Sequence, residues 1–341
     1  MAYTTIDNPE LYFQTKIYTG DGNDNRSITF DGEEDMQPNL TWFKSRSAAT
    51  WHNVYDSVRG ANKSLATNAS NAEETRSDTM DSFDSNGFTL GNDTSQSPNG
   101  LNTNASGYTY VAWCWKESAT AGFDIVSYTG NGSNRTISHS LSAKPAMMIV
   151  KQRSASRDWW VYNKNLDGTD GATGVLYLST TDAAGTSATT SWNSTAPTTS
   201  VFSLGTTVGV NANTGTYIAY CFAEKQGYSK FGSYEGNGNA DGTFVYTGFS
   251  PSFVMLKEID QTGNWCMSDN KRPRYNPTNM VNANEAGAET TDGTNTIDHL
   301  SNGFKLRTTG SSSNTSNSTY IYMAFAEAPF VNSKGVPCNA R

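Results

Sequence analysis

Short apolar runs alternate along the chain with clusters of Gly, Asn, Asp and Ser. Apolar runs of this kind, bounded by turn-forming residues, predict short antiparallel β-strands. Two of the runs, Met147–Val150 and Phe253–Leu256, are apolar at every position, which is typical of strands covered on both faces. The pattern therefore predicts an all-β protein.

A first set of features returns three times in the same order. Each copy opens with Tyr-x-Gly-x-Gly, in which we expect the glycines to supply positive φ in a tight turn. Further on, a proline precedes an apolar run that stops at a lysine six residues later, and proline fits the first residue of a strand. The copies open at Tyr18, Tyr128 and Tyr234, and their proline-to-lysine runs are Pro38–Lys44, Pro145–Lys151 and Pro251–Lys257.

A second set follows each lysine in the same order, and its first two positions keep a constant spacing from the lysine. The eighth residue is His52, Trp159 or Trp265, and the twelfth is Asp56, Asn163 or Asp269. An apolar pair containing phenylalanine comes next, and a strand that begins with tyrosine closes each copy. These features are Gly87-Phe88, Val201-Phe202 and Gly303-Phe304, followed by strands from Tyr110, Tyr217 and Tyr320. Residues that occur in every copy are explained more simply by fold than by function.

The spacing predicts three tandem antiparallel β-sandwich repeats of a jelly-roll or lectin-like type. Because the linkers between them are short, an alternative in which the copies share one larger sheet system stays open. The predicted boundaries are an amino-terminal arm at 1–13, repeats at 14–119, 120–226 and 227–329, and a carboxy-terminal tail at 330–341.

Composition excludes several classes of function. Only 16% of the residues are charged, the net charge is −8, and no run of Lys or Arg could follow a phosphate backbone, so we expect no nucleic-acid partner. The start of the chain lacks a signal-peptide pattern, and no apolar stretch is long enough to span a membrane, so neither secretion nor membrane insertion is expected. We predict no cofactor. The cysteines, which show no metal or disulfide spacing and are predicted to be free and buried, are Cys114, Cys221, Cys266 and Cys338.

Catalytic and metal-binding motifs are absent from the sequence. The three histidines, His52, His139 and His299, occur in no HExxH motif, and there is no nucleophile elbow. We therefore expect no enzyme and no catalytic residues. Glu33–Asp35, near other acidic residues, could bind calcium, but a solvated acidic turn is the favoured interpretation.

Exposed aromatic residues are the candidate ligand-binding residues. Tryptophan can stack on the apolar face of a pyranose, although core packing is the favoured alternative. Because neighbouring strand residues face opposite ways, only one of Trp159 and Trp160 can point into the core. The full candidate set is Trp159, Trp160, Trp265, Trp51 and His52. The loops between the repeated features, 62–104, 167–192 and 272–298, are where we expect recognition.

One spacing indicates a structural ion pair. Asp56 with Arg59 and Asp269 with Arg272 lie three residues apart, whereas the second copy has Asn163 and Leu166 at the same positions. We interpret this as an ion pair that the middle copy has lost.

Several motifs together resemble a family. They are Asn8–Lys16, Tyr18–Gly22, Ser27–Asp31, Asp56–Gly60, Ser82–Phe88 and Tyr217–Glu224. They are similar to an uncharacterised domain that occurs in repeats in marine, cyanophage-type phage proteins, which look like virion or tail-fibre components with concanavalin-A-like lectin sandwiches. The resemblance covers nearly the whole chain. It implies a place on the phage particle surface, after synthesis in the host cytoplasm, and carries over no catalytic or binding residue.

Two functions remain open at this point. The first is a tail-fibre or receptor-binding adhesin that engages host surface polysaccharide. The alternative is a capsid decoration, cement or tail-accessory protein whose partners are other virion proteins. Under the alternative, the amino-terminal arm docks on a neighbouring subunit through Tyr3, Leu11, Tyr12 and Phe13. Virion symmetry suggests a homotrimer in both cases. Head or tail location, copy number, ligand and host are not determined by the sequence.

Overall fold

The chain is almost entirely β-structure in a computed structural model that describes residues 3–94, 100, 102–168, 170–272, 278–290 and 296–338. Helix in this part of the chain is confined to one short 3₁₀-helix, η1 (Pro9–Leu11), and to the one-turn helices α1 (Ala188–Ser191), α2 (Val208–Asn211) and α3 (Ser311–Asn314). The all-β prediction is confirmed, with every sheet antiparallel. Among the described residues, no helix has the length and apolar character to cross a membrane.

We use the predicted boundaries to name a first segment (14–119), a second segment (120–226) and a third segment (227–329). The large sheet of the first segment has the strand order β1 (Phe13–Thr19), β9 (Thr109–Trp115), β3 (Leu40–Ser45), β4 (Asn53–Asp56). Its second sheet has the order β2 (Arg26–Thr29), β8 (Gly87–Leu90), β7 (Met80–Asp84). A third, two-stranded sheet pairs β5 (Lys63–Ser64) with β6 (Glu74–Thr75).

The second segment holds a sheet in the order β10 (Phe123–Thr129), β16 (Thr216–Phe222), β12 (Met147–Gln152), β13 (Trp160–Asn163), β14 (Leu176–Tyr177), and a pair β11 (Arg135–Ser138), β15 (Val201–Leu204). The third holds β17 (Ser229–Glu235), β25 (Thr319–Pro329), β19 (Phe249–Glu258), β20 (Trp265–Asp269), β22 (Val281–Asn282), and a sheet β18 (Phe244–Tyr246), β24 (Gly303–Leu306), β23 (Thr296–Leu300), β21 (Thr278–Asn279).

The three large sheets share their strand order and register. In each, the opening strand pairs with the closing strand, which pairs in turn with the strand that follows the proline. The opening tyrosine of each segment lies opposite the tyrosine that begins its closing strand. The ring centroids of these stacked pairs are 5.2 Å apart for Tyr18–Tyr110, 5.0 Å for Tyr128–Tyr217 and 5.0 Å for Tyr234–Tyr320.

The two glycines of each Tyr-x-Gly-x-Gly motif have different roles. The second has the predicted positive φ, with values of 72° at Gly22, 72° at Gly132 and 65° at Gly238. The first is required by close approach instead, since a Cβ at Gly20 would lie 2.2 Å from the Ala105 carbonyl oxygen. The prediction of positive φ is therefore confirmed for the second glycine only.

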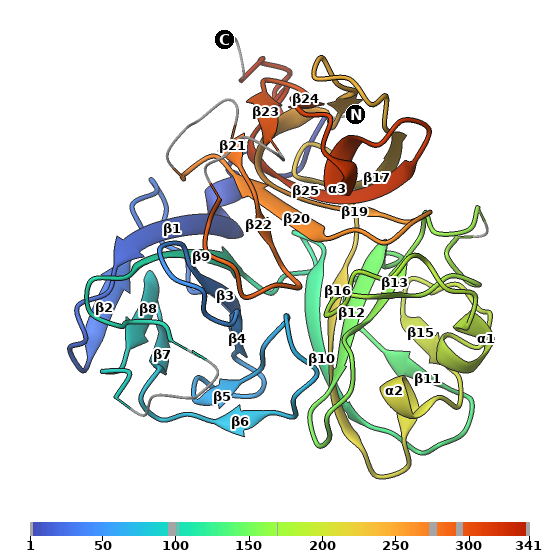
Figure 1. Cartoon of the computed structure of the whole chain (residues 1–341), viewed down its shortest axis with the longest axis horizontal. Helices are drawn as coiled ribbons and strands as arrows, with labels where there is room; N and C mark the ends of the chain where they lie inside the picture. Colours follow the sequence, from blue (N-terminus) through green and yellow to red (C-terminus); the bar gives the residue numbers. More distant parts are fainter. Residues whose placement is uncertain are drawn as a thin grey trace.

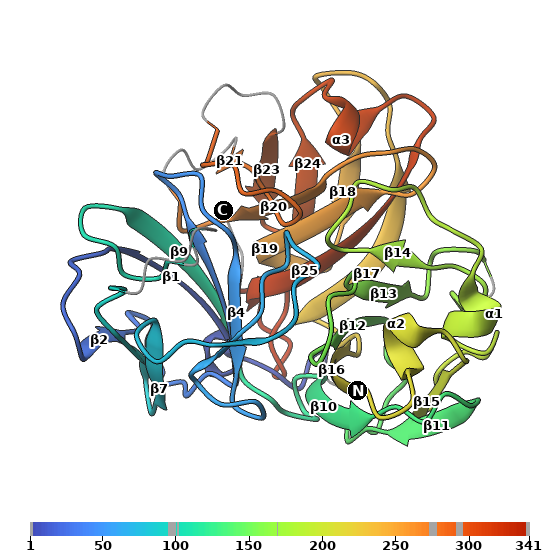
Figure 2. The same ribbon diagram turned by 60° about the horizontal axis from the view of Figure 1, so that its bottom comes forward.

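A smaller sheet covers the outer face of each large sheet, so that each segment is sandwich-like. Phe88, Phe202 and Phe304 are fully buried in the three apolar clusters between these sheets. Figure 2 shows β11, β15, α1 and α2 together on the outer side of the second segment. Cys114, Cys221 and Cys266 are free and buried, as predicted, whereas Cys338 is exposed because it lies in the tail beyond the last strand.

The inner faces of the three large sheets share one core at the centre of the molecule. The segments surround this centre, and appear as blue-to-teal, green-to-yellow and orange-to-red sectors in Figure 1. The Trp115 ring packs against Phe13, Phe222, Phe253 and Phe325, and these contacts join all three segments. The segments therefore form neither a linear series nor one continuous sheet.

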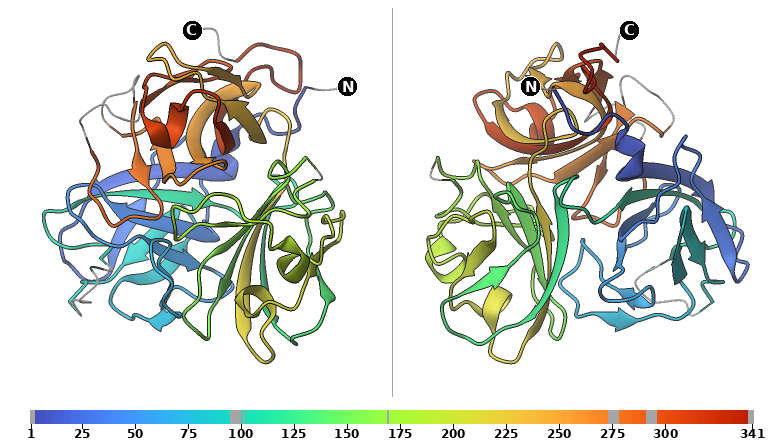
Figure 3. Two further views of the ribbon diagram at one scale, coloured as in Figure 1. Left: turned by 45° about the vertical axis from the view of Figure 1, so that its right-hand side comes forward. Right: turned by 180° about the vertical axis from the view of Figure 1, so that it is seen from behind.

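The amino-terminal arm lies against its own chain. The Tyr3 hydroxyl donates to the Gly248 carbonyl oxygen at 2.7 Å, and the Ser333 amide donates to Asp7 at 2.6 Å. Figure 3 shows the described part of the arm, in dark blue, beside the third segment. The predicted docking residue Phe13 is buried in the central core, so it is not available to a neighbouring subunit. For the half-buried side chains of Tyr3, Leu11 and Tyr12, docking stays a prediction.

Candidate functional site

Three of the candidate ligand-binding residues are buried where two segments meet. Each donates from a ring nitrogen to a backbone carbonyl of another segment: Trp159 Nε1 to Ala66 at 2.8 Å, Trp265 Nε1 to Tyr177 at 2.9 Å, and His52 Nε2 to Asn282 at 3.0 Å. Their rings are at most 1% exposed, which leaves no face for a sugar. These positions match the packing interpretation.

The state of His52 follows from its two partners. Its Nδ1 accepts a hydrogen bond from Trp42 Nε1 at 2.9 Å, so the proton of the neutral ring is on Nε2, which faces the Asn282 carbonyl. Burial, together with the nearby Lys44 charge, holds the pKa of His52 well below its ordinary value of 6.5. His52 is therefore a neutral structural donor.

Trp160 and Trp51 are the two candidates that keep an exposed surface. Both are half-buried. Trp160 faces away from its buried neighbour, as predicted, and packs edge-on against Tyr177 with ring centroids 4.8 Å apart. A role for either in ligand binding stays a prediction.

The lysine that ends each proline-to-lysine run also joins two segments. Lys44 Nζ donates to the Ala286 carbonyl at 3.0 Å, Lys151 to Ser70 at 3.1 Å, and Lys257 to Thr181 at 3.3 Å. All three side chains are buried, and burial lowers the pKa of each lysine to about 8. We call the contacts between the first and second segments the first junction, those between the second and third the second junction, and those between the third and first the closing junction.

The loops expected to carry recognition supply the acceptors for these bonds. Ala66 and Ser70 belong to 62–104, Tyr177 and Thr181 to 167–192, and Asn282 and Ala286 to 272–298. Part of each loop is therefore used inside the molecule. The remaining parts of 62–104, 167–192 and 272–298 include residues 95–99, 101, 169, 273–277 and 291–295, which lie outside the described residues.

Both predicted structural ion pairs are confirmed. Arg59 pairs with Asp56, which also accepts from the Tyr220 hydroxyl at 2.7 Å. Arg272 Nε pairs with Asp269 at 2.6 Å, and Asp269 accepts from Trp113 Nε1 at 3.0 Å. Both pairs are fully buried, and each aspartate also accepts a hydrogen bond from a side chain of a neighbouring segment.

The second segment shows what replaces this pair. Asn163 and Leu166 stand there, and Met323, which has no donor, takes the place of Tyr220 and Trp113 on the neighbouring closing strand. The Asn163 side-chain oxygen, Oδ1, keeps the local hydrogen bond from the Asn165 backbone amide at 2.9 Å, a bond that Asp56 and Asp269 also accept from the residue two positions on. The ion pair and its cross-segment donor are therefore absent together.

A pair of acids lies at the first junction. Glu117 Oε1 accepts from the Ile125 amide at 3.2 Å and lies beside Asp124. Burial, the hydrogen bond with Asp124 and the Asp124 charge raise the pKa of Glu117 to about 7. The folded protein therefore keeps a proton on Glu117 at pH values where an exposed glutamate has lost it.

Replacing Glu117 by glutamine is expected to weaken the pH dependence of stability. The folded pKa lies above the ordinary 4.5, so the native protein binds more protons than the unfolded chain, and its free energy of unfolding falls as the pH rises from about 4.5 to 7. Glutamine keeps an acceptor for Ile125 without titrating. After allowance for solvent screening, we expect the variant to gain about 1 kcal/mol over the wild type between pH 5 and pH 7.5, measured by urea unfolding.

The matched control for this prediction is Glu224→Gln. Glu224 occupies the equivalent place at the second junction, where it accepts from the Phe231 amide at 3.3 Å and pairs with Lys164 at 2.9 Å. Glu224→Gln therefore removes a junction glutamate that is paired with a cation, whereas Glu117→Gln removes one that lies beside a second acid. A difference in stability between wild type and Glu117→Gln that does not change with pH would contradict the raised pKa of Glu117.

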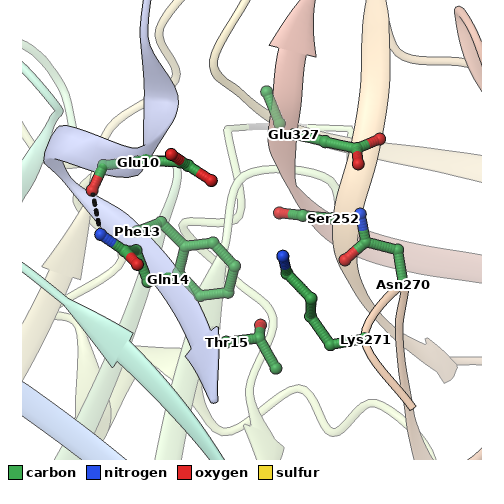
Figure 4. A pocket seen from close by; sticks show the side chains of 9 residues that line it. Glu10, Phe13, Gln14, Thr15, Ser252, Asn270, Lys271 and Glu327 are labelled. Atoms are coloured by element: carbon green, nitrogen blue, oxygen red, sulfur yellow. Dashed lines mark hydrogen bonds between the residues drawn. The ribbon is translucent and has the colours of Figure 1, made fainter. Parts of the chain in front are cut away.

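The closing junction contains a small polar pocket of about 40 Å³. Figure 4 shows Glu10, Gln14 and Thr15 on one side, facing Asn270, Lys271 and Glu327 on the other. Glu327, the equivalent of Glu117 and Glu224, accepts here from the Ser250 hydroxyl at 3.2 Å. The buried Thr15 Oγ1 and Asn270 Oδ1 have no hydrogen-bond partner. The volume is enough for a few water molecules and too small for a sugar ring.

Other titratable groups lie apart from the junctions and the pocket. Ser268 Oγ lies 3.0 Å from His299 Nε2, but both residues are buried in the third segment, and neither lines the pocket of Figure 4. The acidic residues Glu33–Asp35 are exposed. Among the described residues, no three or more His, Cys, Asp and Glu side chains are grouped so that they could hold a metal ion.

Two exposed aromatic residues, Phe244 and Tyr246, were not among the candidates from the sequence. They lie on β18, at the outer surface of the third segment, and are 45% and 49% exposed. The equivalent strands of the other segments, β2 and β11, carry Ser27 with Thr29 and Thr136 with Ser138. A comparison of the three copies aligned on this strand would have found the pair.

The fold and its junctions define an all-β protein in which three sandwich-like segments enclose one core. The chain belongs to the family described as a domain of unknown function, DUF7483, whose model matches residues 8–329 and so runs across all three segments. A search of curated proteins and a search of solved structures each found no match.

Proposed function

We propose that this protein is a phage virion surface protein of the tail-fibre or receptor-binding type, which engages host surface glycans and catalyses no reaction. We further propose that its three segments are copies of one lectin-like unit. The resemblance of its motifs to marine phage virion proteins supports the location, and the shared strand order and register support the copies.

The observation that carries the proposal is the division between inner and outer residues. The polar and aromatic groups found in every segment are used at the junctions, as Lys44, Trp159 and Trp265 show. The outer sheets, by contrast, differ from one segment to another, as the residues of β2, β11 and β18 show. Such a molecule is a rigid body with distinct outer faces, which suits binding to an external surface.

The purified chain is expected to compete with intact particles for adsorption to host cells. Adsorption should fall as the concentration of added protein rises, and free host polysaccharide should block adsorption of the particles as well. Localisation by cryo-electron microscopy, with copy number from the same map, is the companion measurement. Density at the tail tip or fibres agrees with the proposal, whereas density on the capsid lattice without competition would reject it in favour of a decoration protein.

A further inference from the structure

The outer surface of the third segment presents two aromatic side chains on one face of a strand. Phe244 and Tyr246 are two positions apart on β18, so they point the same way, while Val245 between them is buried against Phe304. Two residues of strand separate them by roughly 7 Å. Exposed rings at this spacing form a short apolar strip on the surface.

The fold does not require aromatic residues at these positions. Ile28, Ile137 and Val245 are the inward-facing residues of the equivalent strands, opposite Phe88, Phe202 and Phe304. Serine and threonine flank the first two of these inward residues, and their strands form the same pairing. The two rings are therefore an addition to the third segment. The Tyr246 side chain has a hydrogen bond with Tyr3 of the arm, yet 45% of Phe244 and 49% of Tyr246 stay exposed.

Charged hydrogen-bonding groups border the strip. Lys305 lies opposite Phe244 on β24, and its Nζ is 2.8 Å from Asp241 Oδ1. Arg307 Nη1 contacts the same Asp241 oxygen at 3.1 Å. The Asp241 side chain is 75% exposed, and the hydrogen bond and charge of Lys305 hold its pKa below the ordinary value. An ionised acceptor and two donors thus stand beside the rings.

Lys230 holds Tyr246 in place. Lys230 Nζ lies 5.2 Å from the centroid of its ring and donates to its backbone carbonyl at 2.8 Å. The contact supports one side of the ring while 49% of the residue stays open to solvent. The strip is therefore held in place before any ligand arrives, which lowers the entropic cost of binding.

We propose that Phe244, Tyr246, Lys305 and Asp241 form a carbohydrate-binding site that takes a pyranose of a surface polysaccharide. The apolar face of the sugar stacks on the rings, its hydroxyls donate to Asp241, and Lys305 donates to a sugar oxygen. This inference rests on the proposed function for the class of ligand, and adds the site.

A second copy of the chain fits this surface less well. A stable protein interface buries about 800 Å² on each partner and has a core depleted of charged residues. Here two rings are bordered at once by Lys305, Asp241 and Arg307. The combination of a small apolar strip and adjacent charges suits one or two sugar units.

The test compares two double variants on an array of algal and bacterial polysaccharides, followed by calorimetry on the best-bound polysaccharide. Phe244→Ser with Tyr246→Thr gives β18 the side chains of the first segment. Thr136→Ala with Ser138→Ala changes the equivalent positions of the second segment and is the control. We expect the first variant to lose affinity at least about tenfold, and the control to stay within about twofold of the wild type.

Each outcome either supports or contradicts the proposed carbohydrate-binding site. If the Phe244→Ser/Tyr246→Thr variant binds polysaccharide as tightly as the wild type, the proposed site is wrong and the proposed adhesin function still holds. A wild type that binds no polysaccharide on the array overturns the site, and failure to compete for adsorption as well rejects the adhesin. Thermal melting of both variants tests folding, and Asp241→Asn, which keeps the rings, gives a second measure, with an expected loss of about threefold or more.

Discussion

Replacing Arg272 by leucine is expected to lower the free energy of unfolding by about 3–5 kcal/mol, because the fully buried Asp269 carboxylate would lose its cation. The Trp113 donor, at 3.0 Å, would then be left as the main cross-segment partner of that charge. Urea unfolding, followed by far-UV circular dichroism, measures the loss. A variant as stable as the wild type would show that the buried pair contributes no net stability.

The second segment supplies the control for this substitution. Asp269→Asn combined with Arg272→Leu reproduces the Asn163 and Leu166 that the protein itself uses at the equivalent positions. The double variant removes both charges and keeps an acceptor for Trp113, so we expect it to recover to within about 1–2 kcal/mol of the wild type. A double variant no more stable than Arg272→Leu would contradict the uncompensated-charge explanation.

Replacing Trp115 by alanine is expected to cost about 3–5 kcal/mol, since it leaves a cavity at the centre of the molecule. The ring contacts Phe13, Phe222, Phe253 and Phe325, so the cavity opens toward all three segments. Trp51→Ala removes a half-buried tryptophan and is the control, with an expected cost of about 1 kcal/mol or less.

The same experiment tests the shared core. Because one cluster joins the segments, both the wild type and Trp115→Ala should unfold in a single transition, with the same midpoint by fluorescence and by circular dichroism. Two or three separate transitions in the wild type would contradict a core that the segments hold in common.

The strands could be predicted because the residue pattern that indicates each strand lies within a few neighbouring positions. Strand alternation and the constant count from Pro251 to Lys257 fix which residues share a face, and the structure places them in equivalent strands. The runs that are apolar at every position also indicated two covered faces. They could not indicate that another segment packs on the second face, because the hydrophobic effect is non-directional and does not specify which apolar surface packs on a given face.

The candidate site was predictable only in part, for two physical reasons. The carbonyl that Trp159 bonds is at Ala66, 93 residues away, and no spacing rule relates such positions. The exposed pair on β18 was missed because the turn before that strand differs in length between copies. The number of residues from Gly22 to Ile28 differs from the number from Gly238 to Val245. A count without gaps therefore compares different faces of the strand.

The closing junction is made without a peptide link. The first and second junctions are crossed by the chain near Thr120 and Gly227, whereas the closing junction depends on contacts such as Lys44 with Ala286 and Arg46 with Glu289. The spatial arrangement of the three segments therefore does not depend on which two of the three junctions the chain crosses. Since Asp7 and Ser333 already touch, the architecture is suited to circular permutation, with the old ends joined and new ones opened at either of the covalent crossings.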